Sequence, residues 1–164
     1  HVAIAKYCGP YKLSIHSGSD KFSVYPIMGR LSGEFLHVKT AGTSYLEALR
    51  VICRTDIPLF REIIGFARHR FETDKKTYHV SAQLSMVPEK LAAAELEDVY
   101  LDQVPGRQIL HVTFGSTLKG GQDSRGVFFK ELIMNNLLMH KELYKEVLAI
   151  HLGKHLQLLL ADVD

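Results

Sequence analysis

The sequence lacks a marked excess of charge of either sign, which argues against several classes of function. It has 20 Lys and Arg residues against 18 Asp and Glu residues, a net charge of +2. It contains no basic run with interleaved aromatic residues, so nothing in it predicts binding to nucleic acid. Its apolar stretches are interrupted by charged residues before they reach membrane-spanning length, so we expect no membrane partner. No signal-peptide pattern is visible, and we therefore expect a cytoplasmic protein.

Cysteine is also scarce. Cys8 and Cys53 form no closely spaced motif, and both lie in apolar helical patterns. The sequence therefore predicts two reduced cysteines in the core. Histidine, by contrast, occurs nine times, which hints at metal binding or acid–base chemistry. The alternative is that several of these histidines are ordinary surface residues.

Three stretches share one plan, in which a strand with polar side chains on one face runs into a polar, glycine-containing loop. They cover residues 11–16, 35–40 and 108–114. Because side chains alternate along a strand, His16 lies opposite the apolar face of the first stretch, and Lys39 and His111 do the same in the other two. Parallel α/β folds place their chemistry at the carboxyl ends of strands. The three stretches therefore predict one shared polar centre.

The remaining pattern is mostly helical. Helices are predicted over 2–8, from a cap at Thr43 or Ser44 to about 54, from Asp56 to about 71, over about 89–102, and from about 127 onward, with a bend near Gly153. Residues 23–27 and 78–81 are short segments, the first helical or irregular and the second a strand or irregular. On helical spacing, the helix that ends near residue 71 is predicted to expose a solvated face of Arg61, Glu62, Arg68 and Arg70.

Strands that alternate with helices indicate an α/β protein with a parallel sheet. A closed (β/α)8 barrel needs about 250 residues, so residues 1–164 can supply only part of one. We predict a partial TIM-barrel-like sheet with a helical C-terminal tail from about residue 127. Three strands leave open edges, and self-association is therefore expected.

Five segments, taken in order along nearly the whole chain, resemble the tagaturonate epimerase family of bacterial hexuronate catabolism. They are HSGSDKFSVYPI (16–27), LHVKTAGTSYLEALR (36–50), TYHVSAQLSMVP (77–88), RQILHVTFGS (107–116) and HLGKHLQLL (151–159). The resemblance is to the C-terminal part of that family, whose members are considerably longer. It implies a TIM-barrel-like enzyme that requires a divalent metal and interconverts D-tagaturonate and D-fructuronate by inverting the C4 hydroxyl. We expect the chain to be part of a longer protein.

For such a metal we predict His16 and His111 as ligands. Both follow strand parity toward the same polar side, and imidazole suits Mn, Fe, Co, Ni and Zn. The alternative is that each is a core histidine bonded to its neighbours. His151 and His155, at i and i+4 of one helix, are weaker candidates.

The candidate acid–base residues are Lys39, at the end of its strand, and Asp20, in the first loop. A salt-bridged lysine and a helix cap are the corresponding structural alternatives. The candidates for binding the hexuronate substrate are hydroxyl and cationic side chains in the loops that follow the predicted strands. They are Ser17, Ser19, Lys21, Thr40 and Ser116.

Two other functions stay open at this point. The first is a different isomerase or an aldolase on the same scaffold. The second is a non-catalytic interaction module whose polar strand ends are structural, which would have no reason to retain a stoichiometric metal.

Overall fold

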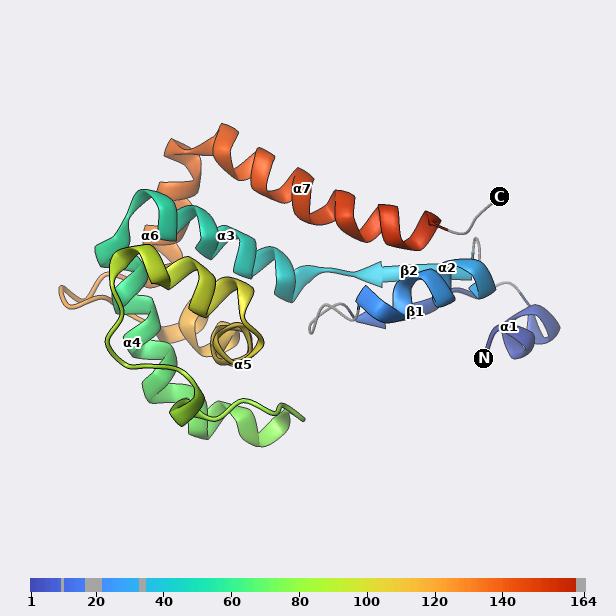
Figure 1. Ribbon diagram of the computed structural model, residues 1–164, viewed down its shortest axis with the longest axis horizontal. Coiled ribbons are helices and arrows are strands. Elements are labelled where there is room, and N and C mark those ends of the chain that lie inside the picture. Colours follow the sequence, from blue (N-terminus) through green and yellow to red (C-terminus); the bar gives the residue numbers. More distant parts are fainter. Residues whose placement is uncertain (10, 17–21, 33–34, 162–164) are drawn as a thin grey trace. The chain divides into compact units, whose positions relative to one another are not determined.

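The computed structural model describes residues 1–9, 11–16, 22–32 and 35–161, and the chain divides into two compact units (Figure 1). The sheet unit comprises His1–Thr43 and Leu148–Asp164, and the helical unit comprises Ser44–Val147. Among the described residues, no helix combines the length and hydrophobicity needed to cross a membrane.

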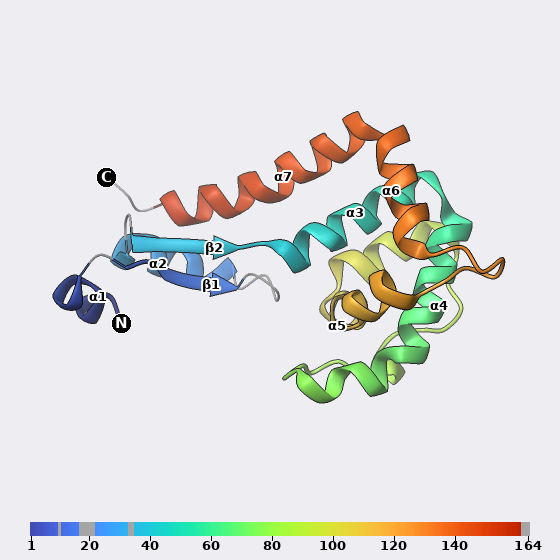
Figure 2. The ribbon, with the colours of Figure 1, turned by 180° about the vertical axis from the view of Figure 1, so that it is seen from behind.

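The sheet unit is built on one βαβ element. Strands β1 (Leu13–His16) and β2 (Leu36–Lys39) are parallel, with Leu13 opposite Leu36 and His16 opposite Lys39. Figure 2 shows the two strands side by side, ending at the same edge. A short 3-10 turn, η1 (Phe22–Val24), and helix α2 (Tyr25–Ser32) make the crossover between them, which parallel strands require. Both predicted strands are confirmed, and of the two alternatives for residues 23–27 the helical one is correct.

Aromatic packing fills the space between the crossover and the last turns of α7 (Lys141–Leu160). Tyr25 is fully buried, and its ring lies 5.3 Å from the ring of His155, which in turn lies 5.1 Å from Phe22. Gly29 permits close approach, because a Cβ atom there would collide with the main chain of Leu159. His155 Nδ1 also donates a hydrogen bond of 2.8 Å within α7 to the carbonyl oxygen of His151. These contacts assign His155 to packing.

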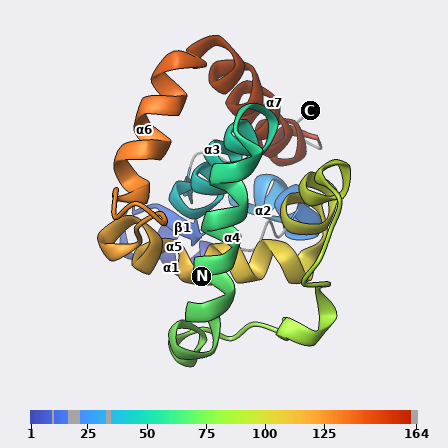
Figure 3. The same ribbon diagram turned by 90° about the vertical axis from the view of Figure 1, so that its left-hand side faces the viewer.

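The helical unit holds most of the buried apolar surface. Its elements are α3 (Ala41–Thr55, which begins in the sheet unit), α4 (Ile57–Asp74), η3 (Lys75–Thr77), η4 (Leu84–Met86), η5 (Ala93–Glu95), the π-helical turn η6 (Asp98–Asp102), α5 (Val104–Gly120), α6 (Phe129–Met139) and the start of α7. Helices α4 and α5 pack against each other and cross steeply (Figure 3). Phe60, Ile63 and Phe71 of α4 and Ile109 of α5 are fully buried in this core.

The start of α4 agrees with the sequence prediction. Asp56 is the N-cap, and its carboxylate accepts a hydrogen bond of 3.0 Å from the main-chain N–H of Leu59. Pro58 lies in the first turn, where a missing N–H costs nothing. The helix continues to Asp74, three residues beyond the predicted end, and the 3-10 turn over residues 75–77 follows it. Helix α3, by contrast, begins before its predicted caps, and the Thr43 hydroxyl donates to the carbonyl of Thr40.

The predicted strand over 108–114 is wrong, because these residues lie in helix α5. The buried positions Gly106, Ile109, Leu110, Thr113 and Thr117 recur at helical spacing. Thr113 and Thr117 satisfy their hydroxyls inside the helix, each donating to the carbonyl four residues earlier at 2.9 Å. Pro105 begins this helix instead of ending the previous one. The described chain is therefore mostly helical with a two-stranded parallel sheet, and the TIM-barrel-like architecture stays a prediction.

Residues 89–102 are not one helix as predicted. They form the short turn η5 and the π-helical turn η6, in which the N–H of Gln103 bonds to the carbonyl of Asp98 at 2.9 Å. Residues 78–81 are irregular. Gly153 lies within a continuous α7, and the break between α6 and α7 falls at His140 instead.

The two cysteines differ. Cys53 is buried as predicted, and burial raises the pKa of its thiol to about 11, so it is protonated at neutral pH. Cys8 is exposed, which corrects its assignment to the core. It lies at the end of the short helix α1 (Val2–Cys8), in which Ala5 is the buried residue.

Arg50 connects α3 to the turn η6 and to Glu97, the residue just before that turn. Its guanidinium bonds to Glu47 at 2.8 Å, to Glu97 at 2.9 Å and to Asp102 at 2.9 Å, and it also donates to the carbonyl of Leu101. The side chains of Arg50 and Glu47 are only 12% and 5% exposed. Because a buried charge is costly without partners, this cluster constrains how α3 meets the turn at 98–102.

Replacing Arg50 by Met should destabilise the helical unit by about 3 kcal/mol, because the buried Glu47 carboxylate loses its main partner. The matched control is Arg54→Met on the same helix. Arg54 is 42% exposed, so its loss should cost about 1 kcal/mol or less. Urea unfolding followed by circular dichroism measures both, and equal losses for the two variants would contradict the assigned role of Arg50.

The carboxyl of Glu97 should contribute a pH-dependent part of the stability. Hydrogen bonds from Arg54 and then Arg50 lower its pKa below the ordinary value of 4.5. A lowered folded-state pKa means that the stabilisation is complete above the unfolded pKa and is lost as the pH falls through the folded one. Between about pH 5 and pH 3, the free energy of unfolding should fall less steeply for Glu97→Gln than for the parent. Glu142→Gln, at a side chain that is 83% exposed, is the control and should keep the parental slope.

Candidate functional site

The polar strand face is the set Ser14, His16, His37 and Lys39, which share one parity on β1 and β2. Ser14 is the register partner of His37, and His16 that of Lys39. Ser14 Oγ lies 3.0 Å from His37 Nδ1. Ser14, His37 and Lys39 are exposed, whereas the alternating residues of the opposite face are half-buried. The parity predicted for these two strands is therefore confirmed, and polar side chains gather at one end of the parallel pair.

The structure brings the main chain of His16 and Lys39 together at the carboxyl edge of the sheet, as predicted. The side chain of His16 lies outside the described residues. So do the whole of Ser17, Ser19, Asp20 and Lys21, whose predicted roles therefore stay predictions.

Thr40 links the strand end to a helix N-terminus. It follows β2 directly and is half-buried, and its carbonyl accepts the Thr43 hydroxyl at 2.9 Å. Helix α3 begins at the next residue. A helix N-terminus at the end of a parallel strand offers main-chain N–H groups and a positive dipole end to an anionic group. Thr40 thus lies where a substrate-binding residue is expected, although no contact tests that role.

His111 and Ser116 belong to the helical unit and lie on α5, so no parallel strand carries them to the sheet edge. His111 is half-buried, and its ring meets that of Tyr78 edge to face at 6.3 Å. Ser116 lines a cavity of about 720 Å³, and Arg70, Thr73 and Lys119 also line it. The predicted strand, which selected His111 by its parity and Ser116 by its place in the following loop, is therefore wrong.

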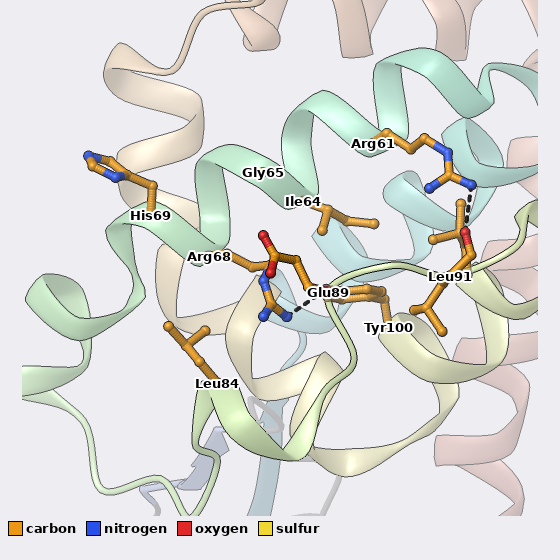
Figure 4. A pocket seen from close by; sticks show the side chains of 10 residues that line it. Arg61, Ile64, Gly65, Arg68, His69, Leu84, Glu89, Leu91 and Tyr100 are labelled. Carbon is orange, nitrogen blue, oxygen red and sulfur yellow. Dashed lines mark hydrogen bonds between the residues drawn. The ribbon is translucent and has the colours of Figure 1, made fainter.

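Two arginines of α4 have partners that the sequence did not indicate. Arg61 donates to the carbonyl of Leu91 at 2.9 Å, and Arg68 donates to the carbonyl of Val87 at 3.0 Å and to the Tyr100 hydroxyl at 3.1 Å. Figure 4 shows both side chains extending from the helix toward the irregular segment that passes over it. Arg61 and Arg68 are seven residues apart, a spacing that is also typical of the exposed face of a helix. The sequence therefore did not indicate this contact.

No group of three or more His, Cys, Asp or Glu side chains able to hold a metal ion occurs in the part of the chain that the structure describes. The described residues therefore do not form a metal centre by themselves.

Comparison with protein families identifies the relatives of this chain. The family model for tagaturonate epimerase matches residues 1–159. The chain belongs to the tagaturonate epimerase family. This confirms the resemblance seen in the five segments.

Members of this family are similar to the chain over nearly its whole length. The tagaturonate/fructuronate epimerase of Thermotoga maritima is 45% identical over 161 residues, which cover 97% of this chain and 32% of that protein. The crystal structure of the fructuronate-tagaturonate epimerase of Cohnella laeviribosi, in a glycerol complex, superposes with a TM-score of 0.85 at 40% identity and the same coverage. Its native form gives a TM-score of 0.84. The chain spans about a third of the length of these tagaturonate epimerase family members.

The hydrogen bond between Ser14 and His37 should select one tautomer of the imidazole. In Ser14→Ala the second tautomer should become more populated, because the partner of Nδ1 is gone. Long-range ¹H–¹⁵N correlation spectra of the histidine side chains measure the two populations. Ser85→Ala, which removes another exposed hydroxyl, should leave the His37 signals unchanged. Unaltered His37 populations in Ser14→Ala would contradict the strand contact.

Proposed function

We propose that the protein containing this chain is an epimerase of hexuronate metabolism that interconverts D-tagaturonate and D-fructuronate. The supporting observation is the family match over residues 1–159, together with relatives that bear this activity in their names. Because the chain spans about a third of those relatives, the activity is proposed for a family-length protein that includes it.

The reaction inverts the hydroxyl at C4, which lies β to the C2 carbonyl of a 2-keto uronate. The C4–H bond of such a sugar acid is not acidic, so direct deprotonation is disfavoured. We propose that a base removes the C4 hydroxyl proton, the C3–C4 bond breaks, and its electrons move to the C2 carbonyl to form an enediolate. The C4 aldehyde then rotates, and C3 adds to its other face as an acid returns the proton.

Lys39 and Asp20 are the proposed acid–base residues. Lys39 is exposed at the end of β2, on the polar strand face, from where an ammonium group can reach a substrate oxygen. Ser17, Ser19, Lys21, Thr40 and Ser116 are proposed to bind substrate hydroxyls and the C6 carboxylate. Of these, Thr40 has the most support, because helix α3 begins beside it and favours an anion there.

A divalent metal is also proposed, with His16 and His111 as its candidate ligands. When bound, such an ion would supply Lewis-acid polarisation of the substrate carbonyl. The position of His16 at the sheet edge fits a ligand. His111 fits less well, because it lies on α5 against Tyr78. The described residues alone lack a three-ligand set, so no reaction step is derived through the metal.

In a family-length protein, His16→Ala should abolish epimerisation of D-tagaturonate through loss of the metal. His16 is the last residue of its strand, so the fold should be retained. Metal affinity should fall by more than the roughly 10–100-fold that even indirect partners of a metal ligand contribute. Plasma mass spectrometry and a turnover assay should show metal content and activity falling together, with circular dichroism unchanged.

The control is His79→Ala, at an exposed histidine of the helical unit, which should keep both metal and activity. If His16→Ala retains the metal and loses only turnover, His16 is an acid–base residue and the ligand assignment is wrong. If it retains both, the histidine is structural.

A further inference from the structure

A cavity of about 530 Å³ lies between α4 and the segment that follows η4, wholly within the helical unit (Figure 4). Arg61 and Arg68 line it from α4, and Glu89 lines it from the segment opposite. Aliphatic side chains, among them Ile64, Leu84 and Leu96, make up much of the remaining wall. Its volume falls within the range of about 300–1,000 Å³ that is usual for small-molecule sites.

The two arginines outnumber Glu89, which is the carboxylate among the described residues that line the cavity. Each donates only to main-chain carbonyls or to a tyrosine hydroxyl, and in the part of the chain that the structure describes neither pairs with a carboxylate. Arg68 is also half-buried. Arg61 is exposed, but Arg68 is partly removed from water, where charges are ordinarily paired. Its guanidinium, with a second one at the same cavity, therefore indicates an anionic partner.

The Arg68 guanidinium is held in place before any ligand arrives. The Tyr100 hydroxyl and the Val87 carbonyl both bind its Nη1 atom, and Tyr100 is 1% exposed. The Nε and Nη2 groups of Arg68 make no hydrogen bond to the described residues, which leaves an edge of the planar fork for an oxyanion. A fixed donor loses less conformational entropy when it binds, and this favours affinity.

We propose that this cavity binds a small organic anion, with its oxyanion on Arg68 and Arg61 and its body against the aliphatic wall. The oxyanion is a carboxylate, as in a sugar acid, or a phosphate. Glu89 shares the cavity without pairing to either arginine, so it weakens anion binding by repulsion. This site goes beyond the proposed epimerase activity and does not depend on it.

The test is a titration of the chain, followed by ¹H–¹⁵N correlation spectra, with D-galacturonate, its neutral counterpart D-galactose and inorganic phosphate. An anion should shift the signals of α4 and of residues 84–100, and D-galactose should not. Arg68→Gln should weaken binding at least tenfold, which is about what a charge-assisted hydrogen bond contributes. Glu89→Gln should strengthen it severalfold. Lys130→Gln, which removes an exposed positive charge of the same unit, should change it little.

A second pair of variants tests the cavity without touching its charges. A Cβ atom on Gly65, which lines the cavity, would meet nothing within 4 Å, so Gly65→Leu should fill the space and abolish binding while favouring the helix. Gly115→Leu on α5, where a Cβ atom also meets nothing within 4 Å, is the matched control and should bind normally.

Tighter binding of D-galacturonate than of phosphate assigns the site to carboxylates, and the reverse order assigns it to phosphates. The proposal is overturned if neither anion binds at about 10 mM, a concentration that would fill most of a site with a Kd of about 1 mM. It is also overturned if D-galactose binds as tightly as D-galacturonate, or if folded Arg68→Gln and Gly65→Leu bind like the parent.

Discussion

The guanidinium of Arg50 is the contact on which the helical unit depends most. It lies among Glu47, Glu97 and Asp102, and it also reaches the carbonyl of Leu101. Leu101 lies at the end of the π-helical turn of residues 98–102, and the last carbonyls of a helical segment have no N–H partner within it, so this carbonyl needs another donor. Arg107 also donates to Leu101, so two arginines hold one irregular turn.

The same solution recurs along the irregular segment from Tyr78 to Gln103. Buried main-chain groups need hydrogen-bond partners, and this segment has little regular secondary structure to supply them. Side chains from the neighbouring helices supply these hydrogen bonds. Arg61 and Arg68 bind the carbonyls of Leu91 and Val87, and the Gln108 side chain accepts the N–H of Ala82 at 2.8 Å. Long polar side chains on α4 and α5 thus fix residues 78–92 of this segment, in which the short turn η4 is the one helical element.

The sheet unit carries His16, Lys39 and Thr40, three of the residues predicted to belong to the site. The polar strand face follows from strict alternation on two short parallel strands, and the helix after β2 adds a dipole at the same edge. His111 and Ser116, which lie on α5, belong to a different structural context from His16 and Lys39. Strand alternation therefore does not account for the positions of His111 and Ser116, which follow the geometry of helix α5.

The sequence by itself determined the features that depend on neighbouring residues. Alternating side chains followed by a polar loop identified both β1 and β2. Asp56 with Pro58 identified the start of α4, because a helix cap involves only three or four consecutive residues. The five family segments also identified the relatives, since they extend in order over most of the chain.

Tertiary structure decided the rest. Residues 108–114 alternate like a strand, yet Ile109, Leu110 and Thr113 are buried together only because α4 packs along one side of a helix. Short apolar runs fit either period, and burial by a distant element selects between them. Apart from Glu47, the partners of Arg50, Arg61 and Arg68 lie at least 19 residues away along the chain, so their roles could not be read from local spacing. A charged side chain on a helix looks solvated in the sequence until a distant carbonyl or carboxylate is brought against it.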